Sequence, residues 1–338
     1  MRIAVTGGGT GGHVFPALAV GEVLAARGHE VFFVGSDGLE ARLVPGRLPF
    51  YRVPAGKLDR TALRPGELLR AARGFFSALA LAGRLRPHAV LATGGYAAFP
   101  FALAARIRGA KLYLHEQNAA FGLTNRLLLP LAREVFLALP VPGARGRVVG
   151  MPILEHRYDP REARARLGLD PDRTTLLVLG GSQGARVLNR RLPELLAPFL
   201  DRIQVIHAAG RGRLAEVDPP GPGYRVVEFV EGPLAWSAAD LAVTRAGAMT
   251  LAEAAYHRVP PVLVPYPYAA GDHQKKNALR YAEAGAARVV EESAIEALPE
   301  VLAELLRPEV REGMARALAA FDPAGSALRI ARAIEEEA

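Results

Sequence analysis

The sequence contains no cysteine, and asparagine and glutamine occur only four times each among 338 residues. Without cysteine the chain can form no disulfide and offers no thiolate ligand, which is typical of a protein in a reducing compartment. Scarcity of the thermolabile amides is a trait of heat-adapted chains. Because so few amides are used, the places where they gather deserve testing as binding sites.

A long uninterrupted hydrophobic run is also missing. The longest uncharged stretch, residues 89–105, is interrupted by Gly94, Gly95 and Pro100. We therefore expect a strand, a loop and a helix there rather than a membrane span. The N-terminus begins directly with a strand-like segment, so no signal peptide is expected. Any contact with a membrane should take place at its surface.

The charge balance favours anionic partners. With 42 Lys and Arg residues against 34 Asp and Glu, the net charge is +8, which suits phosphates, lipid headgroups or nucleic acid. No dense Lys/Arg block with interleaved aromatic residues is present, so nucleic acid is not expected as a partner. A length of 338 residues is enough for about two domains with ample cores.

Strand-like and helix-like segments alternate along the chain, which predicts an α/β fold of mostly parallel sheets covered by helices. In the first half, strands are expected near residues 3–6, 31–34, 89–93, 112–115, 135–137 and 148–149. The pattern then restarts, with strands near 176–179, 205–208, 226–230, 241–244, 262–264 and 287–290. We expect two domains, residues 1–152 and 153–338, with the last helix able to pack back on the first. Two such domains would face each other across a ligand-binding cleft.

The most informative segment is the glycine-rich loop at residues 7–12, which His13 follows. It lies between a strand and a helix that we expect Pro16 to open. Glycines let the backbone approach a ligand, and a helix N-terminus attracts anions. A histidine there can take a proton near neutral pH. The segment predicts a phosphate-bearing ligand beside a general base, but its Gly-x-Gly-x-x-Gly pattern, with Asp37 after the next strand, also fits a dinucleotide site.

Further polar segments follow other strands. A second glycine loop at residues 180–185 stands at the position equivalent to Gly7, and residues 244–253 open a helix that contains Glu253. Other polar clusters lie at residues 93–96, 115–118 and 272–277. All come after strand ends, where α/β proteins bind their ligands. Glu253 can accept hydrogen bonds from a ribose or simply complement the helix dipole, and the sequence leaves both open.

Two places suggest a metal ion, but another interpretation is favoured at each. His115 and Glu116 are adjacent on a strand, where neighbouring side chains point to opposite faces and chelate poorly. Asp170 and Asp172 resemble the Asp-x-Asp motif of some sugar transferases, but they flank Pro171 in a turn, where aspartates commonly bond to the backbone. No metal site and no cofactor are therefore expected.

Six motifs give the chain a specific resemblance. They are GGTGGHVFPALAV, TGGY, HEQN, GGSQGA, RAGAMTLAE and DHQKKNA, in this order from about Gly7 to Asn277. The set resembles the MurG family, bacterial transferases that move N-acetylglucosamine from UDP-N-acetylglucosamine (UDP-GlcNAc) to the 4-hydroxyl of lipid-linked muramyl-pentapeptide (lipid I), giving lipid II for peptidoglycan synthesis. The resemblance implies a GT-B fold of two Rossmann-like domains and an inverting reaction with no required metal or cofactor. It also implies a peripheral location on the cytoplasmic face of the bacterial membrane.

The resemblance assigns a role to each motif. His13 is implied to be the general base that deprotonates the acceptor hydroxyl, which then attacks the anomeric carbon from the face opposite UDP. The implied donor-binding residues are Thr10, Gly11, Gly12, Asn118, Ser182, Val230, Ala248, Met249, Thr250, Leu251, Ala252, Glu253 and Gln274. The residues assigned to the acceptor are Gly9, Gly94, Gly95 and Tyr96. Glu253 is implied to bind ribose, Val230 to meet uracil through its backbone, and the helix after Gly184 to offset charge on the diphosphate.

The chain departs from the family pattern at three positions. Leu154 stands where the family usually has an arginine, Ala246 replaces a serine, and Lys275 replaces a glutamine. Arg157 follows closely enough in sequence to be a candidate substitute for the lost cation. These departures concern affinity for the donor diphosphate rather than the class of reaction.

Other functions fit parts of the sequence. A nicotinamide-dependent oxidoreductase would use the first glycine loop and Asp37, but it would leave the second loop unexplained. A UDP-sugar epimerase of the same architecture would use both loops. A non-catalytic protein that binds anionic surfaces would use only the basic charge, and it would leave His13 without a role.

Residues 63–86 predict how the chain meets a lipid-borne acceptor. The segment contains five arginines, one glutamate and the apolar residues Phe75, Phe76 and Leu79. Apolar residues flanked by cations gain from burial in a membrane interface and from attraction to anionic lipid. The alternative is a helix whose apolar face packs in the core. We expect this segment to bind an anionic membrane surface through Phe75 and Phe76.

Overall fold

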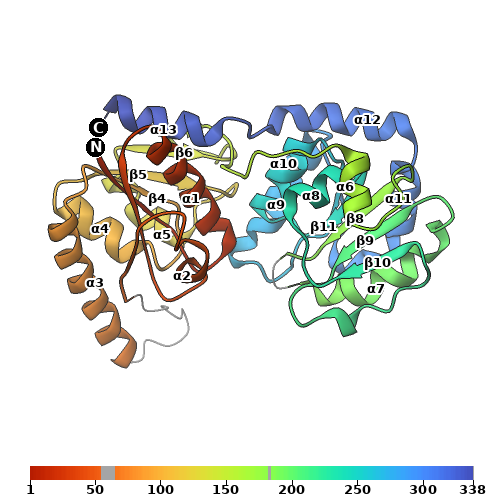
Figure 1. Cartoon of the computed structure of the whole chain (residues 1–338), viewed down its shortest axis with the longest axis horizontal. Helices are drawn as coiled ribbons and strands as arrows, with labels where there is room; N and C mark the ends of the chain where they lie inside the picture. The colour runs from red at the N-terminus through yellow and green to blue at the C-terminus, as the bar shows by residue number, and fades with distance from the viewer. Residues whose placement is uncertain (55–64, 182–183, 338) are drawn as a thin grey trace. The chain divides into compact units, whose positions relative to one another are not determined.

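The structure of the chain is a computed structural model, and it describes residues 1–54, 65–181 and 184–337. The chain divides into two compact units, which are drawn in Figure 1. Unit 1 comprises Met1–Ile153 and Pro323–Ala338, and unit 2 comprises Leu154–Asp322. The sequence-based division after residue 152 placed the last helix in the second domain while allowing for its return. In the structure that helix is part of unit 1.

Unit 1 is built on a seven-stranded parallel sheet with the strand order β3-β2-β1-β4-β5-β6-β7. Its strands are β1 (Arg2–Thr6), β2 (Glu30–Gly35), β3 (Phe50–Arg52), β4 (Ala89–Ala92), β5 (Lys111–Glu116), β6 (Glu134–Leu137) and β7 (Arg147–Val148). Its α-helices are α1 (Gly11–Ala26), α2 (Glu40–Leu43), α3 (Pro65–Leu85), α4 (Phe99–Ile107), α5 (Leu123–Leu128) and α13 (Ser326–Glu337). The chain order reverses between β1 and β4, which makes their carboxyl ends the switch point where doubly wound sheets bind ligands.

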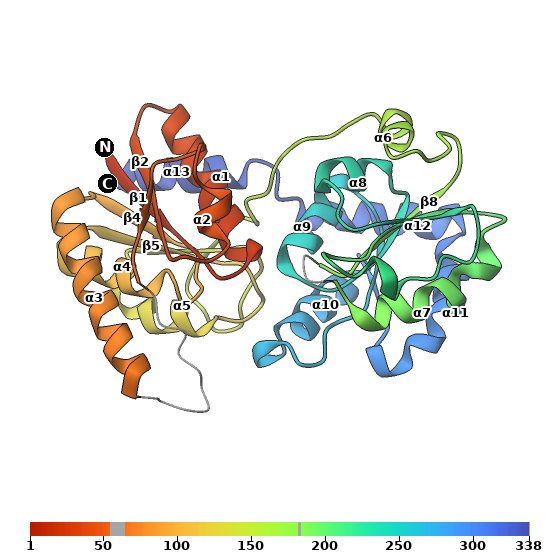
Figure 2. The ribbon, with the colours of Figure 1, turned by 60° about the horizontal axis from the view of Figure 1, so that its bottom comes forward.

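Helices cover both faces of this sheet, which explains why its strands read as nearly continuous hydrophobic runs. Along β1, Ile3 and Val5 face the core shared with α1 and α13, whereas Ala4 faces the core shared with α3 and α4. In Figure 2, α3 and α4 lie side by side. The alternation of side chains along each strand thus decides which helices cover which face.

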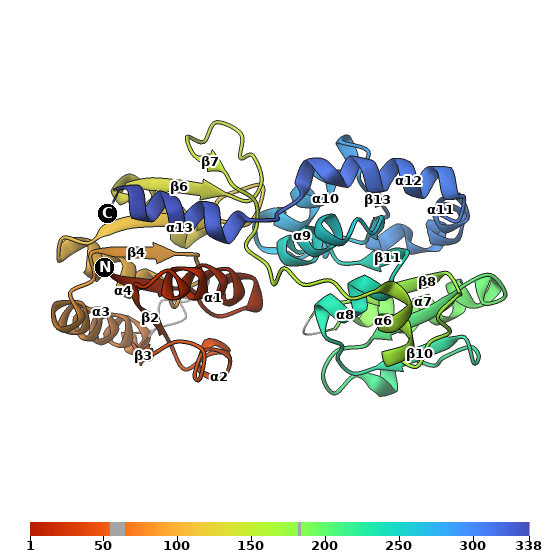
Figure 3. The ribbon, with the colours of Figure 1, turned by 45° about the horizontal axis from the view of Figure 1, so that its top comes forward.

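The C-terminal helix α13 packs against α1 (Figure 3). Ile330 and Ile334 are fully buried in that core. At the next residue, the carboxylate of Glu335 accepts two hydrogen bonds from the guanidinium of Arg27, both at 2.8 Å, and lies 2.8 Å from Nε2 of His29. The hydrogen bonds from Arg27 and His29 lower the pKa of Glu335 to about 2. Apolar burial and ion pairs together hold this helix on unit 1.

Unit 2 repeats the plan with a six-stranded parallel sheet in the order β10-β9-β8-β11-β12-β13. Its strands are β8 (Thr175–Leu179), β9 (Gln204–Ala208), β10 (Tyr224–Val227), β11 (Leu241–Thr244), β12 (Pro261–Leu263) and β13 (Arg288–Val289). Its α-helices are α6 (Pro160–Arg166), α7 (Arg186–Leu196), α8 (Gly232–Ala238), α9 (Ala248–His257), α10 (His273–Glu283), α11 (Leu298–Leu305) and α12 (Pro308–Ala317). Short 3₁₀ helices complete both units: η1 (Leu129–Leu131), η2 (Ala197–Phe199), η3 (Leu214–Glu216), η4 (Ala270–Asp272), η5 (Glu292–Ala297) and η6 (Leu318–Phe321).

The chain order in unit 2 reverses between β8 and β11, so their carboxyl ends form a second switch point. Trp236 of α8 and Ala254 of α9 fill the core on one face of the sheet, and Leu188 of α7 and Leu302 of α11 fill the core on the other. The prediction of an α/β fold with two parallel-sheet domains is confirmed.

One local prediction was wrong, and one short strand was missed. Helix α1 begins at Gly11 rather than at Pro16. Pro16 has no N–H group to donate to the carbonyl of Gly12, but the helical turn before it can still form. In that turn the Thr10 carbonyl accepts hydrogen bonds from the N–H groups of His13 and Val14, both at 3.1 Å. The short edge strand β3 was not predicted, because three residues give little periodicity. In the part of the chain that the structure describes, no helix is both long enough and apolar enough to cross a membrane.

Candidate active site

In unit 1, three predicted segments meet at the carboxyl ends of neighbouring strands. The glycine loop follows β1, residues 93–96 follow β4, and residues 115–118 include the end of β5. The first two pack so closely that side chains are excluded: a Cβ on Gly95 would lie 2.1 Å from the carbonyl oxygen of Gly8, and one on Gly7 would lie 2.1 Å from Oγ1 of Thr93. These glycines are therefore required where the two loops approach each other.

His13 lies in the first turn of α1, half-buried between these loops. Its Nδ1 is 2.9 Å from the carbonyl oxygen of Thr93 and 3.0 Å from Oε1 of Gln117. The Thr93 hydroxyl lies 2.6 Å from the His13 carbonyl oxygen and 3.2 Å from that of Thr6, and it donates to them. Ring and backbone of His13 are thus both tied to the end of β4, which holds the imidazole in one orientation.

Two of the four residues assigned to the acceptor lie against the His13 ring. A Cβ on Gly94 would lie 3.3 Å from Cε1 and Nδ1 of the ring, and one on Gly95 would lie 3.2 Å from its Cδ2. The Tyr96 ring lies against Gly9, whose Cβ would be 2.9 Å from Cε1 of the tyrosine. The structure therefore places Gly94 and Gly95 at the predicted base, and it packs Tyr96 against Gly9 of the glycine loop.

His115 is completely buried at the end of β5. Burial lowers its pKa to about 4, so the ring is neutral at pH 7. Its Nε2 is 3.0 Å from the carbonyl oxygen of Gly150, and its Nδ1 is 3.1 Å from Nε2 of Gln117. Both ring nitrogens of His115 are hydrogen-bonded, and His115 supports the site through Gln117, which in turn contacts His13.

Glu116 organises the loop that follows β5. Its buried carboxylate accepts hydrogen bonds from the backbone and side-chain N–H groups of Asn118 at 3.1 and 3.2 Å, from the Gly122 N–H at 3.0 Å and from Nδ2 of Asn125 at 2.9 Å. The predicted sugar-binding amide Asn118 is thereby held in place. This is the hydrogen-bonding role that we favoured over metal binding for the His115–Glu116 pair.

Sequence reasoning missed Glu40, which is fully buried at the start of α2. Its carboxylate accepts from the N–H and hydroxyl of Ser36 at 2.9 and 2.6 Å and from the N–H of Gly9 at 3.2 Å, so it anchors the glycine loop. The acid we had singled out nearby, Asp37, is exposed and pairs with Arg52 at 3.3 Å. Nothing in the local sequence distinguishes these two acids.

In unit 2, the second glycine loop joins β8 to α7, which begins at Arg186. Gly184 has φ +69°, and a Cβ there would lie 2.2 Å from the carbonyl oxygen of Ala209, so only glycine fits this turn. The predicted diphosphate contact Ser182 lies outside the described residues. At the neighbouring switch-point strand, β11 leads through Gly247 into α9.

The first turn of α9 presents Ala248, Met249 and Thr250 as half-buried residues. Leu251 and Ala252, also predicted to bind the donor, have buried side chains. Only their backbone can therefore contribute to a donor site, because the helix turns those two side chains inward.

Glu253 projects from α9 toward α8. It accepts a hydrogen bond from Nε1 of Trp236 at 3.0 Å, and a Cβ on Gly232 would lie 3.0 Å from its other oxygen. Burial raises the pKa of Glu253 to about 7, and the Trp236 hydrogen bond offsets this only in part. Predicted uracil contact Val230 is half-buried just before α8. No local pattern predicts that the one tryptophan of the chain donates a hydrogen bond to this carboxyl group.

The remaining predicted residues tie neighbouring loops together. Oε1 of Gln274 accepts from the N–H of Tyr266 at 2.9 Å, and Nδ2 of Asn277 donates to the carbonyl of Ala246 at 3.2 Å. Arg245, which sequence reasoning did not single out, is buried, donates to the Val264 carbonyl at 3.1 Å and forms an ion pair with Glu292. These contacts connect the loops that follow β11 and β12 to each other and to α10.

The positions that depart from the family pattern have other partners. Lys275 pairs with Glu291 at 2.9 Å. Arg157, the candidate substitute for the missing cation, lies with its guanidinium carbon 4.2 Å from the centre of the Tyr256 ring and donates to the Tyr256 carbonyl. Leu154 is exposed.

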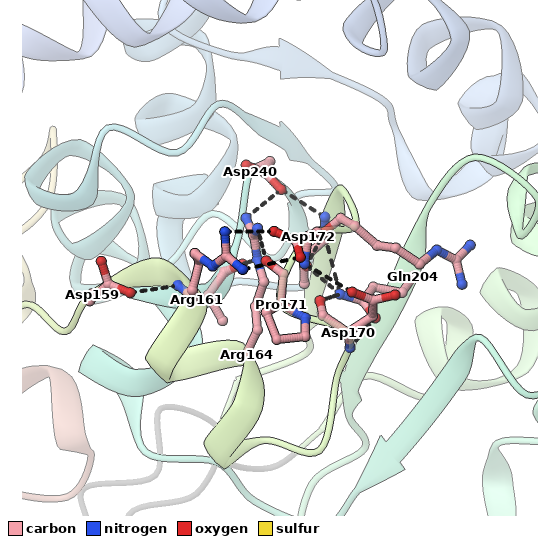
Figure 4. A network of polar contacts seen from close by, with 11 residues as sticks. Asp159, Arg161, Arg164, Asp170, Pro171, Asp172, Gln204 and Asp240 are labelled. Carbon is pink, nitrogen blue, oxygen red and sulfur yellow. Dashed lines mark hydrogen bonds and ion pairs between the residues drawn. The ribbon is translucent and has the colours of Figure 1, made fainter.

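The aspartates of the Asp-x-Asp segment bond to protein groups (Figure 4). Asp170 accepts from the N–H of Asp172 at 2.9 Å, and Asp172 pairs with Arg161 at 3.0 Å. Gln204 bridges to the backbone of Asp170 through hydrogen bonds of 2.9 and 2.7 Å. These contacts match the structural interpretation of this turn. Among the described residues, no group of three His, Asp or Glu side chains is placed to bind a metal ion.

Both halves of the chain match models of one protein family. Residues 3–137 match the N-terminal domain of glycosyltransferase family 28, and residues 175–328 match its C-terminal domain. A protein of Thermus thermophilus named UDP-N-acetylglucosamine–N-acetylmuramyl-(pentapeptide) pyrophosphoryl-undecaprenol N-acetylglucosamine transferase is 52% identical, with 98% of this chain and 99% of the relative covered. A protein of the same name from Deinococcus deserti is 40% identical, with 99% and 98% covered.

Solved structures agree with this result. The crystal structure of Acinetobacter baumannii MurG superimposes with a TM-score of 0.80 at 31% identity and covers 99% of both chains. The crystal structure of the glycosyltransferase of kitacinnamycin superimposes with a TM-score of 0.74 at 19% identity, covering 99% of this chain and 98% of that one. At that low identity, the second likeness shows the fold alone.

Proposed function

This chain belongs to glycosyltransferase family 28, and from that premise we propose that it transfers N-acetylglucosamine from UDP-GlcNAc to the 4-hydroxyl of lipid I, giving lipid II for peptidoglycan synthesis. The observation that carries this function is the full-length match to a transferase of that name, 52% identical over 98% of this chain. The two switch-point sites described above are consistent with it, since the reaction needs an anion-binding donor site and a base.

We assign the UDP moiety to unit 2. The N-terminus of α9 and the glycine loop before α7 offer backbone N–H groups for a diphosphate. Glu253 supplies a carboxyl group that can accept hydrogen bonds from ribose hydroxyls. Ala248, Met249 and Thr250 lie on the same helix, and Val230 lies two residues before Gly232, which packs against the Glu253 carboxyl group. Gln274 and Asn118 are assigned to the sugar.

We assign proton transfer to His13 of unit 1. Its imidazole would take the proton of the acceptor 4-hydroxyl as that oxygen bonds to the anomeric carbon of the donor sugar. The bond from the anomeric carbon to the UDP oxygen breaks at the same time, with inversion at that carbon. UDP leaves with the electron pair, and the proton remains on the imidazole. Thr10, Gly11 and Gly12 at the start of α1 are assigned to phosphates of donor and acceptor.

We further propose that the reaction needs no metal ion or other cofactor. Helix N-termini and loop N–H groups can offset the charge that develops on the leaving diphosphate. The prediction is that EDTA leaves the turnover number unchanged within about twofold. If EDTA abolishes turnover and Mg²⁺ or Mn²⁺ restores it, the assignment is wrong and Asp170 and Asp172 become candidates again.

The acceptor is lipid-borne, so we propose that unit 1 binds the cytoplasmic face of the membrane from the surface. On α3, Phe76 is 66% exposed, and Arg73 and Arg84 of the same helix are also exposed. Phe75 and Leu79 instead pack partly against the core, which corrects the prediction that both phenylalanines face lipid. The part of the segment before Pro65 lies outside the described residues.

The test of the reaction is UDP release from UDP-GlcNAc by the purified protein, with and without a soluble lipid I analogue. The proposal predicts release only when the analogue is present, together with a disaccharide product of equal amount. UDP release or sugar isomerisation without acceptor would instead indicate an epimerase-like activity. Binding of NADH, detected by its fluorescence, would indicate an oxidoreductase.

A further inference from the structure

We propose that Gln117 is a positioning residue that keeps the proton of the neutral His13 ring on Nδ1, so that Nε2 is the nitrogen that accepts a proton. This inference rests on the proposed function only in treating His13 as the base. The structural part of the argument concerns which groups donate and which accept around two buried side chains. Gln117 is 2% exposed and His115 is 0% exposed, so water does not decide these roles.

The orientation of the Gln117 amide follows from its neighbours. The end of the amide assigned as Nε2 lies 2.7 Å from the carbonyl oxygen of Thr93 and 2.9 Å from that of His115. Carbonyl oxygens only accept hydrogen bonds, so this end must be the NH₂ group. Its other end, Oε1, then faces His13 at 3.0 Å.

His115 supports the same orientation independently. Its Nε2 is 3.0 Å from the carbonyl oxygen of Gly150, so that nitrogen carries the proton of the neutral ring. The other nitrogen, Nδ1, is therefore an acceptor, and it lies 3.1 Å from the NH₂ group of Gln117. Three acceptors thus surround one end of the amide, and a flipped amide would place its oxygen against all three.

The Gln117 amide in this orientation and the Thr93 carbonyl together fix the tautomer of His13. Its Nδ1 faces two acceptors, the Thr93 carbonyl at 2.9 Å and Oε1 of Gln117 at 3.0 Å. A lone pair on Nδ1 would point at two oxygen atoms, whereas an N–H bonds to them, so the neutral ring carries its proton on Nδ1 and its lone pair on Nε2. When Nε2 takes a proton, the same two oxygen atoms stabilise the cation without rearrangement.

This role differs from a merely structural one. Gln117 also ties Thr93 to His115 through its NH₂ group, and loss of that tie alone would lower stability without favouring one tautomer. A change in the tautomer of His13, and a fall in kcat without a change in the KM for donor, are specific to the positioning role.

The experiment uses the full-length protein labelled with ¹⁵N-histidine, in which two-dimensional NMR reports the protonated nitrogen of each neutral ring. The eight histidines are reduced to the one of interest by comparison with His13→Ala. The variant is Gln117→Leu. Its matched control is Gln204→Leu, which removes another buried amide, 3% exposed, that bonds to the backbone of Asp170 in unit 2.

We expect the wild-type His13 ring to be protonated at Nδ1 and the Gln117→Leu ring to show a mixture of both tautomers. We expect kcat of Gln117→Leu to fall roughly 10- to 100-fold, less than the ~10⁴-fold loss when a triad loses its orienting carboxylate, because the Thr93 carbonyl remains. The KM for UDP-GlcNAc should stay unchanged. Gln204→Leu should lose stability but keep kcat and the tautomer.

Protonation at Nε2 in the wild type would overturn the inference, and this measurement needs no variant to fold. A Gln117→Leu protein with wild-type kcat, or with an unchanged tautomer, would also overturn the role of Gln117. The proposed function fails separately: a folded His13→Ala protein with normal turnover removes His13 as the base, whatever tautomer the NMR spectrum shows.

Discussion

Three carboxyl groups at the candidate sites, those of buried Glu40 and Glu116 and of half-buried Glu253, have very different surroundings. The carboxylates of Glu40 and Glu116 each accept several hydrogen bonds from backbone N–H groups and polar side chains, and both organise loops. Glu253 accepts one from Trp236, and burial raises its pKa to about 7. A group with so little compensation for burial is poorly stabilised as an anion until a ligand supplies donors, as a ribose would.

This environment predicts a pH-dependent cost in stability. Because the pKa of Glu253 rises from 4.5 to about 7 on folding, the folded state is favoured below pH 4.5 and loses this advantage as the pH rises to 7. The corresponding decrease in the free energy of unfolding is about 3 kcal/mol. Glu253→Gln stays neutral and can keep the Trp236 hydrogen bond, so its stability relative to wild type should increase between pH 4.5 and 7.

Urea unfolding of both proteins at pH 5 and pH 8 measures this effect. Burial lowers the pKa of His207, in the same unit, to about 4. The contribution of His207 to the stability of the protein therefore has the opposite pH dependence and is lost as the pH falls. Its contribution cancels in the difference between the two proteins. An equal stability difference at both pH values would show that Glu253 is already ionised without cost.

At the scale of elements, close packing between the loops after β1 and β4 places His13. Gly95 and Gly109 both have left-handed backbones, with φ +80° and +96°, so alanine costs each about 1–2 kcal/mol. At Gly109 a Cβ meets nothing within 4 Å, whereas at Gly95 it would lie 2.1 Å from the Gly8 carbonyl oxygen. We expect Gly109→Ala to keep the wild-type kcat and the kcat of Gly95→Ala to fall at least tenfold.

Thermal unfolding and steady-state kinetics of the two variants separate these effects. Both should lower Tm, Gly95→Ala by more, and only Gly95→Ala should lower kcat at a temperature where both are folded. Equal kinetics for the two would mean that the position of the glycine loop does not control the base.

The same elements show what a sequence can predict here. The strands and both glycine loops were found because buried parallel strands are continuously apolar and each loop must be glycine-rich. The start of α1 was misplaced because Pro16 is a local signal for a first turn, whereas the turn that holds His13 forms before it. Capping by Thr10 through its backbone alone leaves no side-chain signature.

The supporting residues could not be predicted for a different reason. Glu40, Trp236 and Arg245 reach their partners only because the strand order brings distant loops together. Asp37 and Glu40 are only three residues apart, and nothing in the sequence around them predicts that Glu40 is buried and Asp37 exposed. His13 was singled out from the glycine loop and the helix that follows it, whereas Gly94, Gly95 and Tyr96 were assigned because their motif resembles a family. The structure shows that Gly94 and Gly95 pack against the His13 ring.

For the molecule as a whole, the net charge of +8 and the exposed Phe76 predict binding to anionic vesicles that weakens with salt. Phe76→Ser should weaken this binding several-fold. The control is Leu214→Ser, which removes a 46% exposed apolar side chain from unit 2 and should leave binding unchanged. Sedimentation with neutral and anionic vesicles is the measurement, and equal binding to both kinds, or equal loss in both variants, would count against α3 as the contact.

The central claim is that His13 deprotonates the acceptor hydroxyl in a single inverting transfer of N-acetylglucosamine. The most direct measurement is the single-turnover rate of transfer to a lipid I analogue by wild type and His13→Ala at saturating UDP-GlcNAc, with the donor Kd and the anomeric configuration of the product determined alongside. We predict an inverted product from the wild type, and a rate lower by about 10²- to 10⁴-fold in the variant with an unchanged Kd. A near-normal rate in the folded variant, or a product with retained configuration, would contradict this account.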